Sequence, residues 1–438
     1  MTQTSLLRQD ARTVRRNRAE KRFRAYGLVA IGLGMLMLVI LLTTIISRGT
    51  GAFQQTYLSL EVTLDAAVLD PTGSGDVAQI SKVSTFGYKP LLADAFAQLS
   101  ARGVVQSQLD PDDMADILSP GAEARMRNAV LADPALIGRS VQFDFLTSGR
   151  VDGYLKERVT RASIVNDSNI NAEQLDLVDE LRAAGVLDKR FNIAFITGSD
   201  SSDARPEAAG FGVSMVGSLS MMLVVLVLAL PIGVAASIYL EEFAPKNWIT
   251  DVIEVNISNL AAVPSIVFGI LGLAVFINYM HLPNSAPLVG GLVLTLMTLP
   301  TIIISTRASL KAVPPSIRDA ALGVGASKMQ SVFHHVLPLA APGILTGTII
   351  GLAQALGETA PLLLIGMVGF IASNGPDSIN EALLSPNSAM PAQIYEWAKR
   401  ADPAFYERAW GGIIILLVFL ISMNAVAVLL RRRFERRW

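Results

Sequence analysis

The sequence of 438 residues contains no cysteine, which excludes a disulfide framework and any metal site built on thiolates. Histidine is also scarce. Two of the three histidines, His334 and His335, are adjacent and would point about 100° apart on a helix, so they are not expected to chelate one metal from one face. The phosphate-cradling pattern GxxxxGK[ST] does not occur. The chain is therefore expected to bind no metal or cofactor, to contain no catalytic residue, and not to hydrolyse ATP itself.

Charged residues are scarce too, at 17%, whereas hydrophobic residues make up 51% of the chain and the mean hydropathy is +0.46. This composition is too apolar for a soluble globule of this length. A bilayer is crossed by roughly 20 apolar helical residues. The sequence predicts an all-α polytopic membrane protein with six spans: residues 25–47, about 215–239, two spans within 255–306 on either side of a break at 281–287, one that starts after Pro338 and continues to Gly366, and 409–430.

The orientation of the spans follows from basic residues near their ends. The first 24 residues hold eight basic and two acidic side chains, and the C-terminal sequence RRRFERRW adds five arginines. Both termini are therefore predicted to be cytoplasmic, which an even number of spans allows. One loop disagrees, because residues 241–254 should be cytoplasmic but contain only Lys246 among several acids.

Residues 48–207, between the first two spans, differ in composition and are predicted to form an inserted extracytoplasmic α+β domain. They contain 15 basic and 23 acidic residues. Residues 54–64 alternate like a strand, and residues 89–103 and 171–185 have helical spacing and end at glycine. The sequence DPDDM at 110–114 lacks the calcium-loop pattern, so a solvated turn and helix start is preferred. The sequence assigns no function to this domain.

A polar segment interrupts the apolar sequence at residues 317–338, which the predicted topology places on the cytoplasmic side. A helix is predicted to start at Pro314–Ser316, to turn at Gly325, and to be followed by a second short helix that ends at Pro338. Periodicity alone leaves this amphipathic helix-turn-helix as an ordinary interfacial loop.

The spacing of this segment resembles the EAA loop of binding-protein-dependent ABC importers, which reads E-A-A, three residues, G, nine residues, I-x-L-P. Asp319, Ala320 and Ala321 form the triplet, Gly325 has the required offset, and Leu337 and Pro338 close the pattern. Asp319 replaces the usual glutamate, and His335 stands where isoleucine is common. The resemblance implies that residues 314–338, here called the coupling loop, dock on a separate ATPase subunit that binds ATP and magnesium.

A second set of motifs is similar to the PstA family of phosphate importer permeases: GETAPLLLIG at 357–366, VPSIVFGI at 263–270 and LPIGVAASIYLEEFAP at 230–245. The resemblance covers residues 208–438, which it makes an ABC permease core of the MetI-like type with five spans. It does not cover the basic tail 1–24, the first span 25–47 or the domain 48–207. It implies a multi-pass permease in the cytoplasmic (inner) membrane of a bacterium, paired with a homologous permease subunit, an ATP-binding cassette ATPase and an extracytoplasmic phosphate-binding protein.

Candidate residues for the translocation path follow from the same region. Glu358 is an ionisable residue in an apolar span, which marks either a functional carboxylate or a helix-packing one, and Thr359 could donate a hydrogen bond nearby. Family members often have arginines where this chain has Gln354 and Ile304. Arg307 lies one helical turn beyond Ile304, so it either substitutes for the missing charge or anchors the cytoplasmic end of the fourth span.

Two other functions stay open at this point. A permease of the same architecture could carry another oxyanion, such as sulfate or molybdate. A membrane-anchored signalling or scaffold protein is a second possibility, although broken, glycine-rich spans together with a coupling motif argue against it. No nucleic-acid partner is expected.

Overall fold

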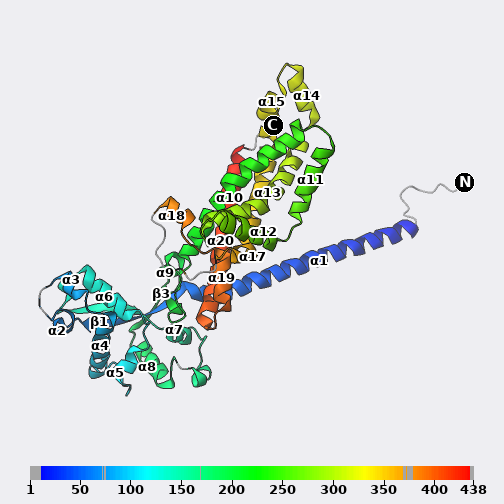
Figure 1. The fold of residues 1–438 in the computed structure, drawn as a ribbon. Coiled ribbons are helices and arrows are strands. Elements are labelled where there is room, and N and C mark those ends of the chain that lie inside the picture. The colour runs from blue at the N-terminus through cyan, green and yellow to red at the C-terminus, as the bar shows by residue number, and fades with distance from the viewer. Residues whose placement is uncertain are drawn as a thin grey trace.

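The computed structural model describes residues 11–71, 73, 75–167, 169–367, 371 and 378–434. They form a helical bundle, a smaller domain at one end of the bundle, and a long N-terminal helix whose C-terminal end lies where the two meet and whose N-terminal end extends away from both (Figure 1). The basic residues Arg8, Arg436 and Arg437 of the two tails lie outside the described residues.

The N-terminal helix α1 spans Ala11–Gly49, so the predicted first span and most of the predicted basic tail form one helix. Only 6% of its most apolar stretch is buried within the chain. An apolar helix surface left uncovered in this way is stable in hydrocarbon or against another protein, but not in water.

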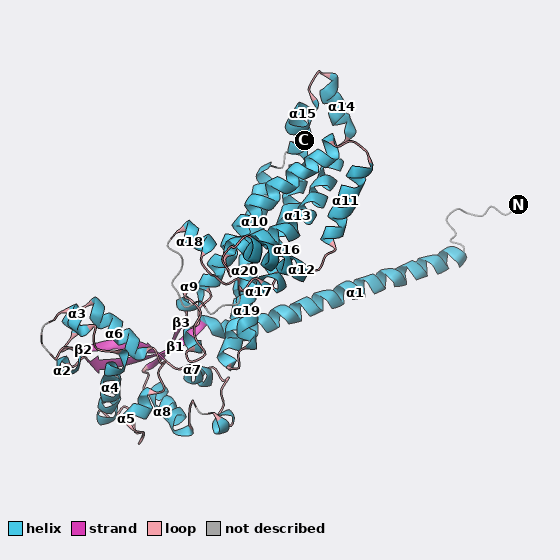
Figure 2. Ribbon diagram, in the orientation of Figure 1, coloured by secondary structure: helices cyan, strands magenta, loops and turns pink. Residues whose placement is uncertain are grey.

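Four long helices form the bundle: α10 (Gly212–Ile238), α13 (Pro287–Lys311), α16 (Leu337–Gly357) and α20 (Pro403–Phe434) (Figure 2). Small residues let them pack closely. A Cβ atom added at Gly347 of α16 would lie 2.0 Å from Ser305 Oγ of α13, and one at Gly233 of α10 would lie 2.7 Å from Ile302 Cγ2. Backbones brought together by small residues are typical of helix packing in membranes.

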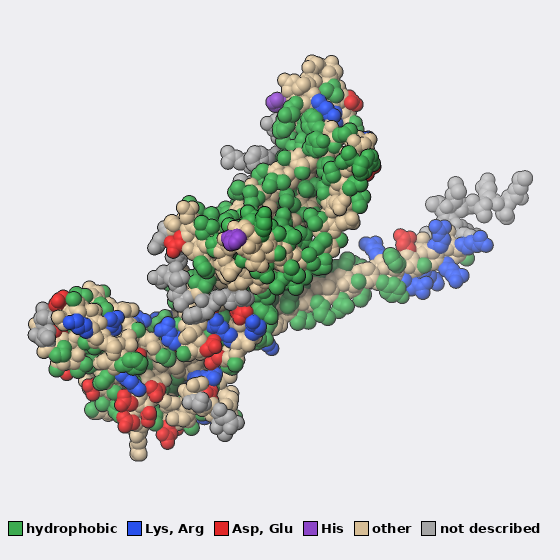
Figure 3. All heavy atoms as spheres, viewed as in Figure 1, with side chains coloured by type: hydrophobic (Ala, Val, Ile, Leu, Met, Phe, Trp, Pro, Cys, Tyr) green, Lys and Arg blue, Asp and Glu red, His purple; other side chains and the backbone are tan. Residues whose placement is uncertain are grey.

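Within the described residues, five helices are long and apolar enough to cross a membrane, and a bent pair would make a sixth. The bent pair is α11 (Trp248–Ala261) and the segment formed by α12 (Ser265–Leu271) and the π-helix η7 (Gly272–Tyr279), which meet at 102°. The third predicted span is therefore not one straight helix. The break precedes Pro264, where the residue before a proline disfavours helical backbone. Charged side chains gather at the two ends of the visible bundle face and leave an apolar band between them (Figure 3).

The fifth predicted span is too long at its C-terminal end. α16 stops at Gly357, the backbone of Glu358 is extended, and the short helix α17 (Ala360–Leu364) follows. Pro361 explains the break, because it has no N–H to donate to a continuing helix and restricts the residue before it. By contrast, the break predicted at 281–287 is confirmed, since α13 begins at Pro287.

Residues 54–191, here called the sheet domain, form a three-stranded antiparallel sheet of order β2-β1-β3, with β1 (Gln54–Thr63), β2 (Ser140–Leu146) and β3 (Leu187–Phe191). The strand predicted at 54–64 is confirmed, as are the helices α4 (Lys89–Ala101) and α8 (Ala172–Ala183). Asp110 caps α5 (Pro111–Ala115), as predicted for the DPDDM turn. The sheet domain has its own core, built on Leu58, Leu60 and Val62 of β1.

The remaining elements connect these parts. Around the sheet domain they are α2 (Ala66–Leu69), α3 (Val77–Ile80), η2 (Thr85–Tyr88), α6 (Ala122–Ala132), η3 (Pro134–Leu136), α7 (Gly149–Leu155) and η4 (Ser163–Asn166). At the junction and in the bundle they are η1 (Thr50–Phe53), α9 (Ile193–Thr197), η5 (Pro206–Ala208), the π-helix η6 (Tyr239–Phe243), α14 (Pro315–Gly323), α15 (Lys328–Ser331), the π-helix η8 (Val332–Val336), α18 (Ile379–Leu384) and α19 (Met390–Lys399).

Candidate functional site

The coupling loop projects from the end of the bundle opposite the sheet domain (Figure 1). Its first helix α14 begins at Pro315, as predicted, and ends in a turn at which Gly325 has a φ of +89°. The amide of Gly325 donates to Leu322 O (3.0 Å) and the amide of Ala326 donates to Ala321 O (3.0 Å). This pair of bonds is the Schellman arrangement that ends a helix on a left-handed residue.

The second helix of the coupling loop does not end at Pro338, which corrects the prediction. Helix α15, the π-helix η8 and α16 form one continuous helix from Lys328 to Gly357. Pro338 cannot donate to the preceding turn, and the wider π-helical turn of Val332–Val336 directly before it accommodates that loss. The coupling loop therefore runs without interruption into a bundle helix.

The residues of the EAA-like pattern separate into two groups in space. Asp319, Ala320 and Gly325 are exposed on the projecting tip and Ala321 is buried beneath them, whereas Leu337 and Pro338 lie in the first turn of α16. At the tip Val324 is 87% exposed and Leu322 48% exposed. The tip of the coupling loop therefore presents apolar side chains to its surroundings.

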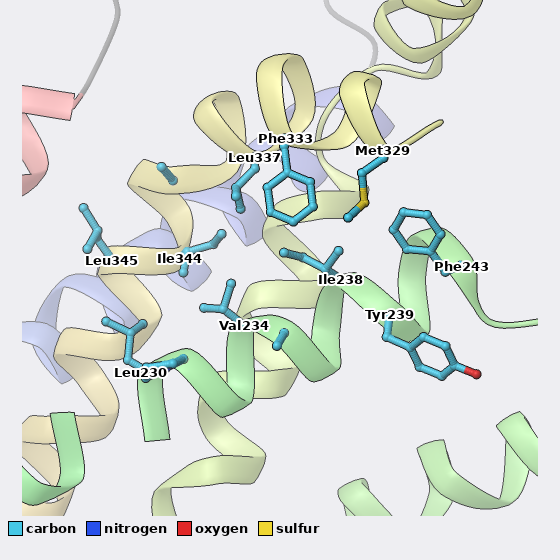
Figure 4. A pocket seen from close by; sticks show the side chains of 13 residues that line it. Leu230, Val234, Ile238, Tyr239, Phe243, Met329, Phe333, Leu337, Ile344 and Leu345 are labelled. Atoms are coloured by element: carbon cyan, nitrogen blue, oxygen red, sulfur yellow. The ribbon is translucent and has the colours of Figure 1, made fainter. Parts of the chain in front are cut away.

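An apolar groove of about 860 Å³ lies between the coupling loop and α10 on one side. Met329 and Phe333 line it from the loop, and Ile238, Tyr239 and Phe243 line it from α10 and η6 (Figure 4). Beside the groove, Val332 and Val336 of the loop share a buried apolar cluster with Ile238 of α10, and Lys328 Nζ lies 5.3 Å from the ring centroid of Phe243.

Arg307, a candidate for the translocation path, lies near the coupling-loop end of α13. Its side chain is 15% exposed and pairs with Glu254 of α11 (2.5 Å) and Glu241 of η6 (3.4 Å). Its charge is thus matched by two carboxylates in this conformation. An anion could use Arg307 only if these pairs opened.

The acidic loop that disagrees with the predicted orientation has a structural explanation. Its acids Glu241, Glu242 and Glu254 pair with Arg307 and Lys311 of α13 and with Arg318 of the coupling loop. Sequence reasoning missed these three acids as functional candidates. The signal was present, because an acidic loop placed on the same side as a basic loop suggests that the two neutralise each other.

Gln354, Glu358 and Thr359 come together at the break between α16 and α17. Gln354 is exposed, and Glu358 and Thr359 are half-buried. Within the described residues, the Glu358 carboxylate makes no hydrogen bond or ion pair. Glu358 therefore lies at a helix break with a free carboxylate, not inside a continuous span.

The two motifs that flank the breaks pack against each other. Gly269 of VPSIVFGI faces Pro361 of GETAPLLLIG so closely that an added Cβ would lie 2.7 Å from Pro361 Cα. The bend at 262–264 and the bend at 358–359 are thus brought together through α12 and α17. Discontinuous helices of this kind at membrane depth occur where backbone borders a cavity or another protein segment.

Arg307 is distant from the Gln354–Glu358 group. Ser305 and Ser309 of α13 face Gly347 and Gly343 of α16, so Arg307 is level with residue 345. Gln354 lies nine residues farther along α16, or roughly 13 Å at the rise of an α-helix. The helices α10, α16 and α17, and α13 before Arg307, contain no basic residue. Among the described residues, no basic side chain forms an ion pair with Glu358.

A buried ionic cluster, which sequence reasoning missed, joins the sheet domain to the start of α20. Lys156 of the sheet domain contacts Asp152 (2.6 Å) and Glu407 of α20 (3.1 Å), and Arg158 pairs with both of these acids.

Arg408, the next residue of α20, is held by hydrogen bonds. Its guanidinium donates to Ala52 O (3.0 Å), Gln55 Oε1 (2.7 Å) and Glu207 O (2.9 Å). The adjacent pair Glu407–Arg408 at the start of an apolar run was the available signal. The cluster fixes the sheet domain to a bundle helix.

Glu207 gives this junction a pH dependence. Burial raises the pKa of the Glu207 carboxyl, and the hydrogen bond with Ser119 offsets part of that rise. The folded protein therefore binds this proton more tightly than the unfolded chain, so the stability of the junction falls as pH rises from the ordinary value of 4.5 to the raised pKa.

Glu207→Gln removes this loss, because glutamine resembles the protonated acid. We expect the difference in melting temperature, variant minus wild type, to increase as pH rises from about 4 to about 8. Thermal unfolding of the purified proteins in detergent measures it. The other titrating groups are common to both proteins and cancel in the comparison. Parallel melting curves across this range would contradict the expectation.

Comparison with known proteins identifies two family matches along the chain. Residues 229–438 match the binding-protein-dependent transport system inner membrane component, and residues 10–164 match a domain of unknown function, DUF3333. The chain is 30% identical to the phosphate transport system permease protein PstA of Yersinia pestis over 225 residues, which cover 51% of this chain and 73% of that protein.

It is 31% identical to PstA of Mycobacterium leprae (strain TN) over 235 residues, 53% of this chain and 74% of that protein. Among solved structures, an inward-facing conformation of the MetNI methionine ABC transporter aligns with a TM-score of 0.38 and 15% identity, covering 52% of this chain and 95% of that chain.

Proposed function

The chain belongs to the family of phosphate transport system permeases called PstA, and from this premise we propose that it is the membrane-spanning permease subunit of an ATP-driven importer for inorganic phosphate. One structural observation carries the coupling part of this proposal. The coupling loop projects from the bundle at the end opposite the sheet domain, with its apolar tip uncovered. The substrate rests on the names of the relatives.

In this proposal the chain forms half of the translocation path with a homologous permease subunit, and six spans place both termini in the cytoplasm. The coupling loop docks on an ATP-binding cassette ATPase of the cytoplasmic side, and a phosphate-binding protein delivers the anion outside. Binding and hydrolysis of ATP on the partner move the coupling loop and shift the spans between outward-open and inward-open states.

The path itself runs past the helix breaks in this proposal. The free Glu358 carboxylate repels phosphate and so is not a direct ligand; it controls the path or pairs with a cation of the partner subunit. Gln354 and Thr359 are neutral donors beside it. The absence of basic residues from α10, α16 and α17 supports the view that much of the compensating charge comes from outside these helices.

Uptake of labelled phosphate and labelled sulfate tests the proposal in bacterial cells that lack this subunit. We expect phosphate uptake through this system to be lost, to return when the wild-type chain is supplied, and sulfate uptake to be the same with or without it. Phosphate uptake that does not change when the subunit is removed would refute the proposal. Loss of sulfate uptake alone would identify a permease for another oxyanion.

A further inference from the structure

Arg318, in the first helix of the coupling loop, contacts two other parts of the bundle at once. Its Nη2 lies 2.7 Å and its Nε 3.1 Å from Glu242 Oε1 of η6, at the end of α10. The same guanidinium donates to Leu310 O (2.9 Å) and Val313 O (2.8 Å) at the end of α13. The Arg318 side chain is 22% exposed and that of Glu242 only 7% exposed.

The chemistry of these contacts makes a rigid connection. The last carbonyls of a helix have no partner within it, and a cation near them is also favoured by the helix dipole. A guanidinium presents its donors in a fixed fork, so it holds a carboxylate and two carbonyls with a defined geometry, which a lysine ammonium does not. One side chain therefore fixes the position of α14 relative to both α10 and α13.

The surroundings of Arg318 strengthen this role. The neighbouring acid Glu241 binds Lys311 (3.5 Å) and Arg307 (3.4 Å) of α13, so the π-helical turn η6 is fixed to α13 at several points. On the other side of the coupling loop, Val332 and Val336 share a buried apolar cluster with Ile238 of α10, beside the groove in Figure 4. Apolar contacts are non-directional, whereas the Arg318 contact holds the loop to α10 with a defined geometry.

We propose that Arg318 is a positioning residue that transmits movement of the coupling loop to α10 and α13, with Glu242 as its anchor on α10. This inference rests on the proposed function, since it assigns a path to the movement that an ATPase would impose on the loop. Arg318 does not touch the anion, and its substitution changes how much transport each ATP hydrolysed produces.

The test uses the complete transporter complex reconstituted in vesicles, with phosphate uptake and ATP hydrolysis measured in the same preparation. For Arg318→Gln and for Glu242→Gln we expect the phosphate transported per ATP to fall about tenfold, while the ATPase still copurifies at the wild-type ratio. The double variant should be no worse than either single one, because both remove the same contact. Arg318→Lys keeps the charge but loses the fork of donors. Its phosphate transported per ATP should lie between the values for wild type and for Arg318→Gln.

Arg102→Gln is the matched control, because Arg102 also forms an ion pair (with Glu61, 2.9 Å) but lies exposed on the sheet domain. It should keep the wild-type ratio. A wild-type ratio in Arg318→Gln, or in Arg318→Lys if the glutamine variant fails to fold, overturns the inference. Loss of the ATPase from the purified complex also overturns it, since Arg318 would then serve docking. If the wild-type complex does not accumulate phosphate, the proposed function itself fails.

Discussion

Replacement of Arg408 by methionine is expected to lower the free energy of unfolding by about 3 to 5 kcal/mol, the range for breaking a buried charge network by removing one partner. Arg408 is 3% exposed and its guanidinium lies 5.1 Å from the ring centroid of Phe195. Methionine keeps an apolar stem of similar length. It leaves the carbonyl of Glu207 and the side-chain oxygen of Gln55 without their donor, while Ala52 O keeps the Nδ2 of Asn192 at 3.4 Å. Each unsatisfied buried group costs about 1–3 kcal/mol.

Thermal unfolding in detergent measures this effect, and a loss of this size corresponds to a melting temperature lower by roughly 10 °C. Arg102→Met is the control, because its exposed pair with Glu61 should contribute nothing measurable. If Arg408→Met and Arg102→Met have the same melting temperature, the cluster does not stabilise the junction. The comparison matters for function as well, since a sheet domain held by this cluster must follow α20 whenever that helix moves.

The sequence predicts much of this molecule because its strongest signals are local. The break at 281–287 predicts the start of α13, and the alternation of residues 54–64 predicts β1. Both patterns lie within one short segment of the chain. The turn at Gly325 was also predictable, because a helix that ends within a polar segment needs a residue that tolerates positive φ.

Other features could not be predicted because they depend on contacts between distant segments. The helix breaks before Pro264 and Pro361 face each other only because Gly269 lets α12 approach α17. The pairing of Arg307 with Glu241 and Glu254 places three helices side by side, which no single segment encodes. A prediction from hydropathy alone shows these segments as straight spans and does not show which charges pair.

Replacement of Gly325 by alanine is expected to reduce phosphate uptake about tenfold. Gly325 has a φ of +89°, which costs a residue with a Cβ atom roughly 1–2 kcal/mol, and a difference of 1.4 kcal/mol shifts a conformational equilibrium tenfold. There is no steric reason for glycine here, because an added Cβ would meet nothing within 4 Å. Any effect therefore comes from the backbone conformation.

Substitution of Gly323, two residues earlier, tests whether the effect comes from the backbone conformation of Gly325 or from any added side chain at this tip. It too has open space around an added Cβ, but it ends α14 without a positive φ, so Gly323→Ala should slightly favour the helix and leave uptake unchanged. Uptake is measured in cells that lack the native subunit, with the amount of each variant in the membrane determined alongside. Gly325→Ala shifts the coupling loop away from the turn that the amides of Gly325 and Ala326 close, and so displaces the exposed Val324 from the surface that an ATPase would contact. Equal uptake in the two variants would mean that the turn geometry does not matter for coupling, whereas a defect confined to Gly325→Ala would tie transport to the shape of this tip.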